Sequence, residues 1–197
     1  FGAKLVHFST DYVFPGYPSD RKLFPNGYPE DQPPEPVNIY GKTKLEGEEA
    51  VQKSDADYLI IRVAWLCGQY GQNFVTKMLE LAKTNDTLQV VDDQWGSPTF
   101  ARNVVENTLT LIKHDEAGLF HVNSNGIINW YEFAQKIFDL AQIDISLEKV
   151  SSKTFEAKAE RPAFSKLDTA KLASIPGSKI IDWETGIEQL IKNISQA

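Results

Sequence analysis

Tyr40 and Lys44 are the residues of this sequence whose types and spacing most directly suggest chemistry. Residues four apart on a helix lie on one face, so this pair would present a phenol and an ammonium group together. A phenol is a poor proton donor at neutral pH, because its ordinary pKa lies near 10. A positive charge about 4 Å away stabilises the ionised form by roughly 4 kcal/mol at an effective dielectric of about 20. Such a phenol suits general acid–base catalysis, although tyrosine and lysine also occur at this spacing by chance.

A second group of polar residues follows a predicted strand. Residues 4–8 form a short run with apolar and β-branched side chains, and Ser9 and Thr10 come directly after it. Open α/β sheets bind their ligands beyond the carboxyl ends of their strands. The pattern therefore predicts one site, with the two hydroxyl groups at a strand end and Tyr40 and Lys44 on the helix that follows.

The elements around this site form a βαβ pattern. Proline restricts its own backbone and that of the preceding residue, so the helix that carries Tyr40 is predicted only after the prolines of 33–36, over about 37–53. Residues 58–63 are nearly all apolar, as in a strand buried on both faces. The connection between these two strands should be right-handed. Residues 11–36 are predicted to be a long loop above the site.

Predicted strands and helices also alternate along the rest of the chain, which favours an α/β sheet. Asn129 and Asp182 are each placed to cap the start of a helix by a side-chain hydrogen bond. The further elements expected are helices over about 73–83 and 99–113 and short strands over 88–91 and 119–122.

Several motifs, taken in order, resemble the dTDP-4-dehydrorhamnose reductase family of extended short-chain dehydrogenases/reductases. They are STDYVF at 9–14, NIYGKTKLEGE at 38–48, RVAW at 62–65, NFV at 73–75, VVDDQWGSPT at 90–99, and Arg161-Pro162 followed by Ser165, Leu167 and Asp168. The resemblance covers about residues 4–170, and the combination is specific although each motif alone is not. It implies a Rossmann-like doubly wound parallel sheet with a smaller α/β substrate domain.

The resemblance also implies roles for individual residues. Tyr40 would donate a proton to the substrate, Lys44 would assist it and hold the nicotinamide ribose, and Thr10 would polarise the substrate carbonyl, with Ser9 beside the cofactor. The expected cofactor is NADPH or NADH. The expected reaction is the reduction of a dTDP-sugar with a 4-keto group, dTDP-4-dehydro-L-rhamnose, to dTDP-L-rhamnose. The residues expected to bind this substrate are Thr10, Asp11, Tyr12, Trp65, Gln94, Ser97 and Arg161.

Two of these predicted substrate contacts are also consistent with a residue that has no part in binding. Trp65 is equally consistent with an ordinary core tryptophan, and Arg161 with a surface arginine. The guanidinium fork of an arginine suits a diphosphate group, which favours Arg161 as a contact to the nucleotide.

No G-x-G-x-x-G motif occurs in the sequence, although dinucleotide-binding sheets normally open with one. The resemblance implies that about half of the Rossmann domain would precede residue 1, so we expect this chain to be the C-terminal part of a longer protein. By the same resemblance, residues 1–68 and 98–123 belong to the dinucleotide-binding domain. Residues 69–97 and 124–197 would then form the substrate-binding domain.

Composition narrows the class of protein. The net charge of −7 argues against a nucleic-acid partner, and no apolar run reaches the roughly 20 residues that span a bilayer. A single cysteine, Cys67, excludes an internal disulfide and fits a reducing cytoplasm. Asp92, Asp93 and the three histidines lack the spacing of a metal site, so no metal is expected. The sequence leaves open whether the protein forms a homodimer.

Two other functions remain compatible with these residues. A nucleotide-sugar epimerase or dehydratase with bound NAD shares the motif of Tyr40 and Lys44. A branch of the resembled family is a non-catalytic regulatory subunit of methionine adenosyltransferase, and an intact catalytic motif can persist in a binding protein. Net consumption of NADPH distinguishes the reductase from both.

Overall fold

The computed structural model describes residues 2–154 and 159–196, and its largest sheet is parallel. Three strands lie in the order β1-β2-β7, with β1 at Lys4–Thr10, β2 at Asp57–Val63 and β7 at Gly118–Val122. Both pairings are parallel, with Phe8 opposite Ile61 and Ile61 opposite Phe120. The predicted α/β class with a parallel sheet is confirmed.

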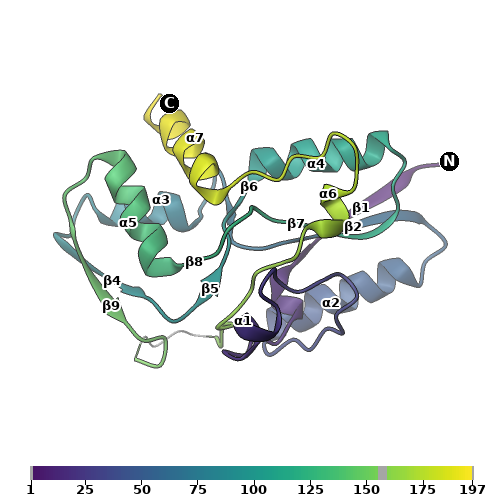
Figure 1. Ribbon diagram of the computed structural model, residues 1–197, viewed down its shortest axis with the longest axis horizontal. Coiled ribbons are helices and arrows are strands. Elements are labelled where there is room, and N and C mark those ends of the chain that lie inside the picture. Colours follow the sequence, from purple (N-terminus) through teal and green to yellow (C-terminus); the bar gives the residue numbers. More distant parts are fainter. Residues whose placement is uncertain (1, 155–158, 197) are drawn as a thin grey trace.

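Helices cover both faces of this sheet. Helix α2 (Ile39–Gln52) joins β1 to β2, and α4 (Ala101–Lys113) precedes β7, so that α2 and α4 lie on opposite sides of the strands (Figure 1). Successive residues of a strand point to opposite faces. Leu59 and Ile61 of β2 accordingly pack in one core with Leu111 of α4, while Arg62 is turned towards Glu48 of α2.

A second group of elements lies beside the sheet (Figure 1). Its core joins helices that are far apart in the sequence, through buried residues such as Val75, Phe133 and Ile187. The helices are α3 (Phe74–Leu81), α5 (Trp130–Ala141) and α7 (Trp183–Ser195), and the paired strands are β4 (Thr87–Val91) with β9 (Ser146–Val150), β5 (Trp95–Gly96) with β8 (Ile128–Asn129), and β3 (Leu66–Cys67) with β6 (Thr99–Phe100).

The predicted division into two domains stays a prediction, and its residues 1, 155–158 and 197 lie outside the described part of the chain. Two residues pack with the domain opposite to the one predicted for them. Leu172, in the short helix α6 (Ala170–Ala173), packs with Ile175 and Ile180 in the core of the three-stranded sheet. Phe100, by contrast, packs in the core of the second group.

An extended stretch, residues 163–168, connects the two groups, and we call it the bridging segment. On one side it exchanges backbone hydrogen bonds with Trp95, which donates to Ala163 (2.8 Å) and accepts from Ser165 (2.9 Å). On its other side Tyr28 donates to Lys166 (2.9 Å) and accepts from Asp168 (2.9 Å). The bridging segment therefore fixes the position of strand β5 relative to the loop that follows β1 and contains Tyr28.

Three predicted details differ in the structure. The loop expected over residues 11–36 contains a 3-10 helix, η1 (Asp11–Val13), and a short helix, α1 (Asp20–Leu23). The helix expected from Thr99 begins two residues later, because Thr99 and Phe100 pair with β3. Asp182 stands at the start of α7 without capping it, since its carboxylate instead accepts from Asn125 at 2.8 Å.

Candidate active site

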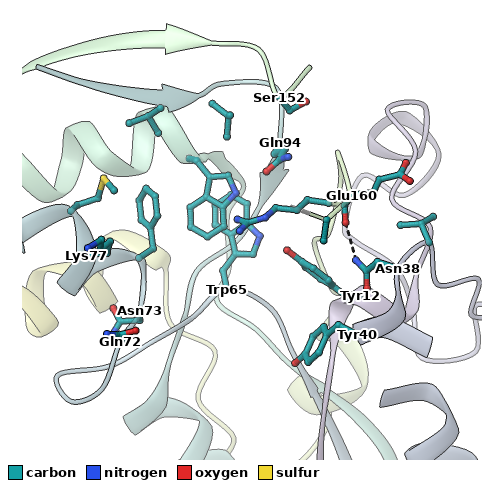
Figure 2. A pocket seen from close by; sticks show the side chains of 18 of the residues that line it. Tyr12, Asn38, Tyr40, Trp65, Gln72, Asn73, Lys77, Gln94, Ser152 and Glu160 are labelled. Carbon is teal, nitrogen blue, oxygen red and sulfur yellow. Dashed lines mark hydrogen bonds between the residues drawn. The ribbon is translucent and has the colours of Figure 1, made fainter. Parts of the chain in front are cut away.

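A cavity of about 1040 Å³ lies between the two groups of elements (Figure 2). Tyr12 and Tyr40 line it on one side, and Asn73 and Lys77 line it on the other, with Trp65 between them (Figure 2). Of the residues predicted for the site, those that line this cavity are Tyr12, Tyr40, Trp65, Gln94 and Arg161.

Tyr40 stands at the first turn of α2, and its side chain is 54% exposed. Its ring meets that of Tyr12 edge to face, with centroids 5.7 Å apart. This contact requires Gly41, because a Cβ there would collide with the carbonyl oxygen of Tyr12. The glycine thus lets the helix that carries the phenol approach η1 closely.

Asn38 fixes the start of this helix in two directions. Its side-chain oxygen accepts from the backbone of Gly41 at 2.8 Å, which is the capping interaction typical of asparagine. Its amide nitrogen donates to the carbonyl of Glu160 at 2.9 Å (Figure 2). Asn38 thereby holds Tyr40 on the same wall of the cavity as Arg161, which follows Glu160 in the sequence.

Lys44 lies one turn after Tyr40, as its spacing predicted. Its ammonium group donates to the backbone carbonyl of Phe8 near the end of β1. An ammonium has three donors, so two remain for other partners. The lysine is therefore anchored at the strand end while its neighbour Tyr40 faces the cavity.

Thr10 and Ser9 lie behind the cavity wall. Each is only 4% exposed. The Thr10 hydroxyl accepts from the backbone of Tyr12 at 3.2 Å and donates to Asp11 at 2.9 Å, so it caps η1. The Ser9 hydroxyl has no partner among the described residues. In this arrangement the proton of Thr10 points to a carboxyl group, and its predicted contact with a substrate carbonyl stays a prediction.

Asp11 is buried as well, at 4% exposed. Burial raises the pKa of its carboxyl to about 7, against hydrogen bonds from Thr10 and Ser165 that lower it. Burial likewise raises the pKa of Tyr12 to about 12, helped by the charge of Asp11 and opposed by that of Arg161. Asp11 is thus a carboxyl group that changes charge near neutral pH beside the predicted catalytic residues.

Replacing Asp11 by asparagine is expected to remove a fall in stability between about pH 4 and pH 7. With its pKa raised from 3.8 to about 7, the folded carboxyl keeps a proton that the unfolded chain has already released. The unfolded state then binds fewer protons, so the free energy of unfolding falls as pH rises, by at most about 1.4 kcal/mol per pH unit. Asparagine is neutral throughout and lacks this slope.

Urea unfolding at intervals from pH 4 to pH 8 measures the difference between the two proteins. The exposed Asp55 supplies the control, because an Asp55→Asn protein keeps the buried carboxyl and should keep the slope. Parallel curves for wild type and Asp11→Asn across this range would contradict the prediction.

Two tryptophans stack to form the middle of the cavity wall. The rings of Trp65 and Trp130 are 3.5 Å apart between centroids and inclined by only 9°. Trp130 is the first residue of α5, which Asn129 caps by accepting from Glu132 at 2.9 Å, as predicted. Trp130 was not predicted as a site residue from the sequence. The cap located the start of the helix, but no local pattern relates this residue to Trp65.

Two further residues were predicted to contact the substrate, Gln94 and Ser97, and the structure places them differently. Gln94 is 7% exposed and lines the cavity. Ser97 is fully buried and its hydroxyl donates to the carbonyl of Ser124 at 2.9 Å. Ser97 does not line the cavity, because a hydrogen bond inside the fold uses its hydroxyl, and its predicted contact with a substrate stays a prediction.

Within residues 2–154 and 159–196, no three histidine, cysteine or acidic side chains gather as a metal site would require. Asp93, one of the paired carboxylates, accepts from the hydroxyl of Ser151 at 2.8 Å and from the backbone of Ser152. None of the described helices combines the length and apolar character needed to cross a membrane.

Comparison with known proteins gives consistent matches over nearly the whole chain. The family model described as the RmlD substrate binding domain matches residues 1–196. The spore coat polysaccharide biosynthesis protein SpsK of Bacillus subtilis is 37% identical over 196 residues, covering 100% of this chain and 66% of that protein. The dTDP-4-dehydrorhamnose reductase of Escherichia coli K12 is 36% identical, covering 98% of this chain and 66% of its own length.

A solved structure agrees with these sequences. The crystal structure of dTDP-4-dehydrorhamnose reductase from Bacillus anthracis in complex with NADP superposes with a TM-score of 0.91 at 40% identity. The match covers 98% of this chain and 66% of that one. The Rossmann-like fold predicted from the sequence is confirmed, and the chain spans just under two thirds of the length of these relatives.

Proposed function

Because the chain belongs to the family of the RmlD substrate binding domain, we propose that its protein reduces a 4-keto nucleotide sugar with NADPH or NADH. The substrate that we propose is dTDP-4-dehydro-L-rhamnose, and the product is dTDP-L-rhamnose. The observation that carries the proposal is Tyr40, held half-exposed on the wall of a cavity of about 1040 Å³. The reductases among its relatives support the same reaction.

In this reaction Tyr40 donates its proton to the oxygen of the sugar carbonyl as that oxygen gains negative charge. The ammonium of Lys44, one helical turn away, stabilises the phenolate that remains. Thr10 is proposed to hydrogen-bond the same oxygen, which requires its hydroxyl to turn from Asp11. A bound nicotinamide cofactor supplies the hydride.

The cavity offers surfaces suited to the rest of such a substrate. Trp65 and Trp130 present an aromatic wall against which a sugar ring or a base packs. Arg161 lines the cavity near Tyr12 and carries the planar fork that suits a diphosphate. The residues that we propose as substrate contacts are Tyr12, Trp65, Gln94 and Arg161. We propose Asp11 as a buried group that influences the site without lining the cavity.

The residues present fit the nicotinamide end of a cofactor. Tyr40 and Lys44, one helical turn apart, offer a phenol and an ammonium group to a ribose, and the buried hydroxyl of Ser9 lacks a partner among the described residues. The sequence itself holds no glycine fingerprint for the pyrophosphate. We accordingly propose that residues 1–68 and 98–123 belong to a dinucleotide-binding domain, and that residues 69–97 and 124–197 belong mainly to a substrate-binding domain.

The test is stoichiometric turnover in a chain extended to the relatives' full length. We expect one NADPH or NADH to be consumed for each 4-keto sugar reduced. Conversion with catalytic NAD and no net consumption would instead favour an epimerase or dehydratase. No turnover, together with co-purification of a methionine adenosyltransferase, would favour the regulatory subunit. A cytoplasmic location and a homodimer remain proposals for fractionation and light scattering to test.

A further inference from the structure

We infer that Ser165 is a positioning residue whose hydroxyl sets the orientation of the Trp65 indole in the cavity wall. Ser165 belongs to the bridging segment, so this segment would shape the substrate site in addition to joining the two groups of elements. Its effect on substrate binding rests on the proposed function, while the orientation of the indole does not.

The first observation is that Trp65 is held in an unusual backbone conformation. Its φ angle is +44°, in the left-handed region that side chains other than glycine rarely adopt. Such a conformation persists only where the surroundings impose it, and it is frequent at functional sites. The surroundings of Trp65, including the contacts of its indole, therefore impose this conformation.

Three contacts restrain the indole. One face stacks on Trp130, with the two rings inclined by 9°. Gly96 packs so closely beside the indole that a Cβ there would lie 2.7 Å from the Trp65 Cε2. The ring nitrogen, Nε1, donates to the hydroxyl oxygen of Ser165 at 2.9 Å.

Only the third of these contacts is directional. Stacking and close packing fix the plane of the ring, but a half-turn about the Cβ–Cγ bond keeps that plane and exchanges the two edges of the indole. An N–H···O hydrogen bond prefers a nearly linear arrangement, so it selects one of these two orientations. The bond to Ser165 therefore decides which edge of the Trp65 indole faces the cavity.

Ser165 is itself held firmly. It is 3% exposed, and its backbone donates to the carbonyl of Trp95 at 2.9 Å. Its hydroxyl also lies close enough to Asp11 to lower the pKa of that carboxyl, which burial raises. The hydroxyl oxygen accepts from Trp65, and Asp11 in turn accepts from Thr10 at 2.9 Å. Polar side chains therefore follow one another from Thr10 past Asp11 and Ser165 to the indole.

The primary experiment is Ser165→Ala in the extended enzyme, with KM and kcat measured for the 4-keto sugar nucleotide. We expect KM to rise about three- to tenfold, as for the loss of one hydrogen bond, and kcat to change by less than about twofold. An indole that contacts ground state and transition state alike affects binding more than chemistry. A tenfold fall in kcat at unchanged KM would overturn the inference.

A second readout needs no activity. The indole N–H signal of Trp65 in a 15N–1H spectrum, assigned by its disappearance in Trp65→Phe, should shift in Ser165→Ala and exchange faster with solvent. An unmoved signal overturns the inference whatever the kinetics show. A moved signal in a protein that does not reduce the sugar supports the inference and counts only against the proposed function.

Two controls separate positioning from a general loss of packing. In a Trp65→Phe background the N–H donor is absent, so adding Ser165→Ala should leave KM unchanged; an equal rise in KM there would overturn the inference. Thr108→Ala removes another buried hydroxyl, which donates to Val104 at 2.7 Å within α4. This variant should leave the Trp65 signal unmoved.

Discussion

Replacing Tyr40 by phenylalanine is expected to lower kcat of the proposed reductase by about a hundredfold to ten-thousandfold, the usual range for loss of a general acid. Phenylalanine retains the ring, and with it the edge-to-face contact with Tyr12 at 5.7 Å. The substitution therefore removes the hydroxyl and little else. Because the aromatic wall and Arg161 remain, we expect KM to change by only a few-fold.

The measurement is the rate of NADPH oxidation with the 4-keto sugar nucleotide under saturating conditions. Tyr70→Phe is the matched control, since Tyr70 is 84% exposed and lies outside the cavity. It should retain the full rate. A Tyr40→Phe protein that also retained the full rate would show that another group supplies the proton.

Replacing Glu48 by glutamine is expected to cost about 3–5 kcal/mol of folding stability, because it leaves a buried guanidinium without its counter-charge. The Glu48 and Arg62 side chains are only 1% and 3% exposed. They form a two-pronged pair, with Nε–Oε1 at 2.8 Å and Nη2–Oε2 at 2.6 Å. The free energy of unfolding of a typical protein is about 5–15 kcal/mol, so the expected loss is a large share of it.

Apart from Glu48, the side chain of Arg62 has one hydrogen-bonding neighbour within residues 2–154 and 159–196. This is His121, with Nη1 of Arg62 at 3.5 Å from Nε2. Burial and the charge of Arg62 lower the pKa of His121 to about 3. The imidazole is therefore neutral at physiological pH and brings no negative charge to the site.

Urea unfolding at pH 7 measures the loss, with Glu49→Gln as the control. Glu49 pairs with Lys53 at 3.0 Å on the exposed face of the same helix, where an ion pair contributes about 0.2–1 kcal/mol. A double substitution, Glu48→Leu with Arg62→Met, should recover much of the loss by removing both charges. Equal losses for Glu48→Gln and Glu49→Gln would contradict this account.

This buried pair also bears on the site. Glu48 lies on the helix that carries Tyr40 and Lys44, and Arg62 lies on the central strand three residues before Trp65. The pair therefore joins the elements that hold the proposed proton donor and the aromatic wall. A loss of rate in Glu48→Gln should appear together with the loss of stability, unlike the loss in Tyr40→Phe.

The sequence by itself determined the elements whose hydrogen bonds are local. Tyr40 and Lys44 share a helix because good helix-forming residues follow a run of prolines, and Asn129 caps its helix through a partner only three residues away. Residues 58–63 were predictable as a buried strand because their apolar run leaves no polar face. Such patterns are satisfied within one element and are readable without the rest of the chain.

Tertiary structure alone decided which of these side chains meet. Trp65 stacks on Trp130 and bonds to Ser165, 65 and 100 residues further along the chain, and no periodicity relates such positions. Ser97 was expected at the cavity, yet packing turned its hydroxyl to a backbone carbonyl inside the fold. The partner of a buried hydroxyl such as that of Ser97 depends on what the folded chain brings near it, because an unpaired buried polar group costs about 1–3 kcal/mol.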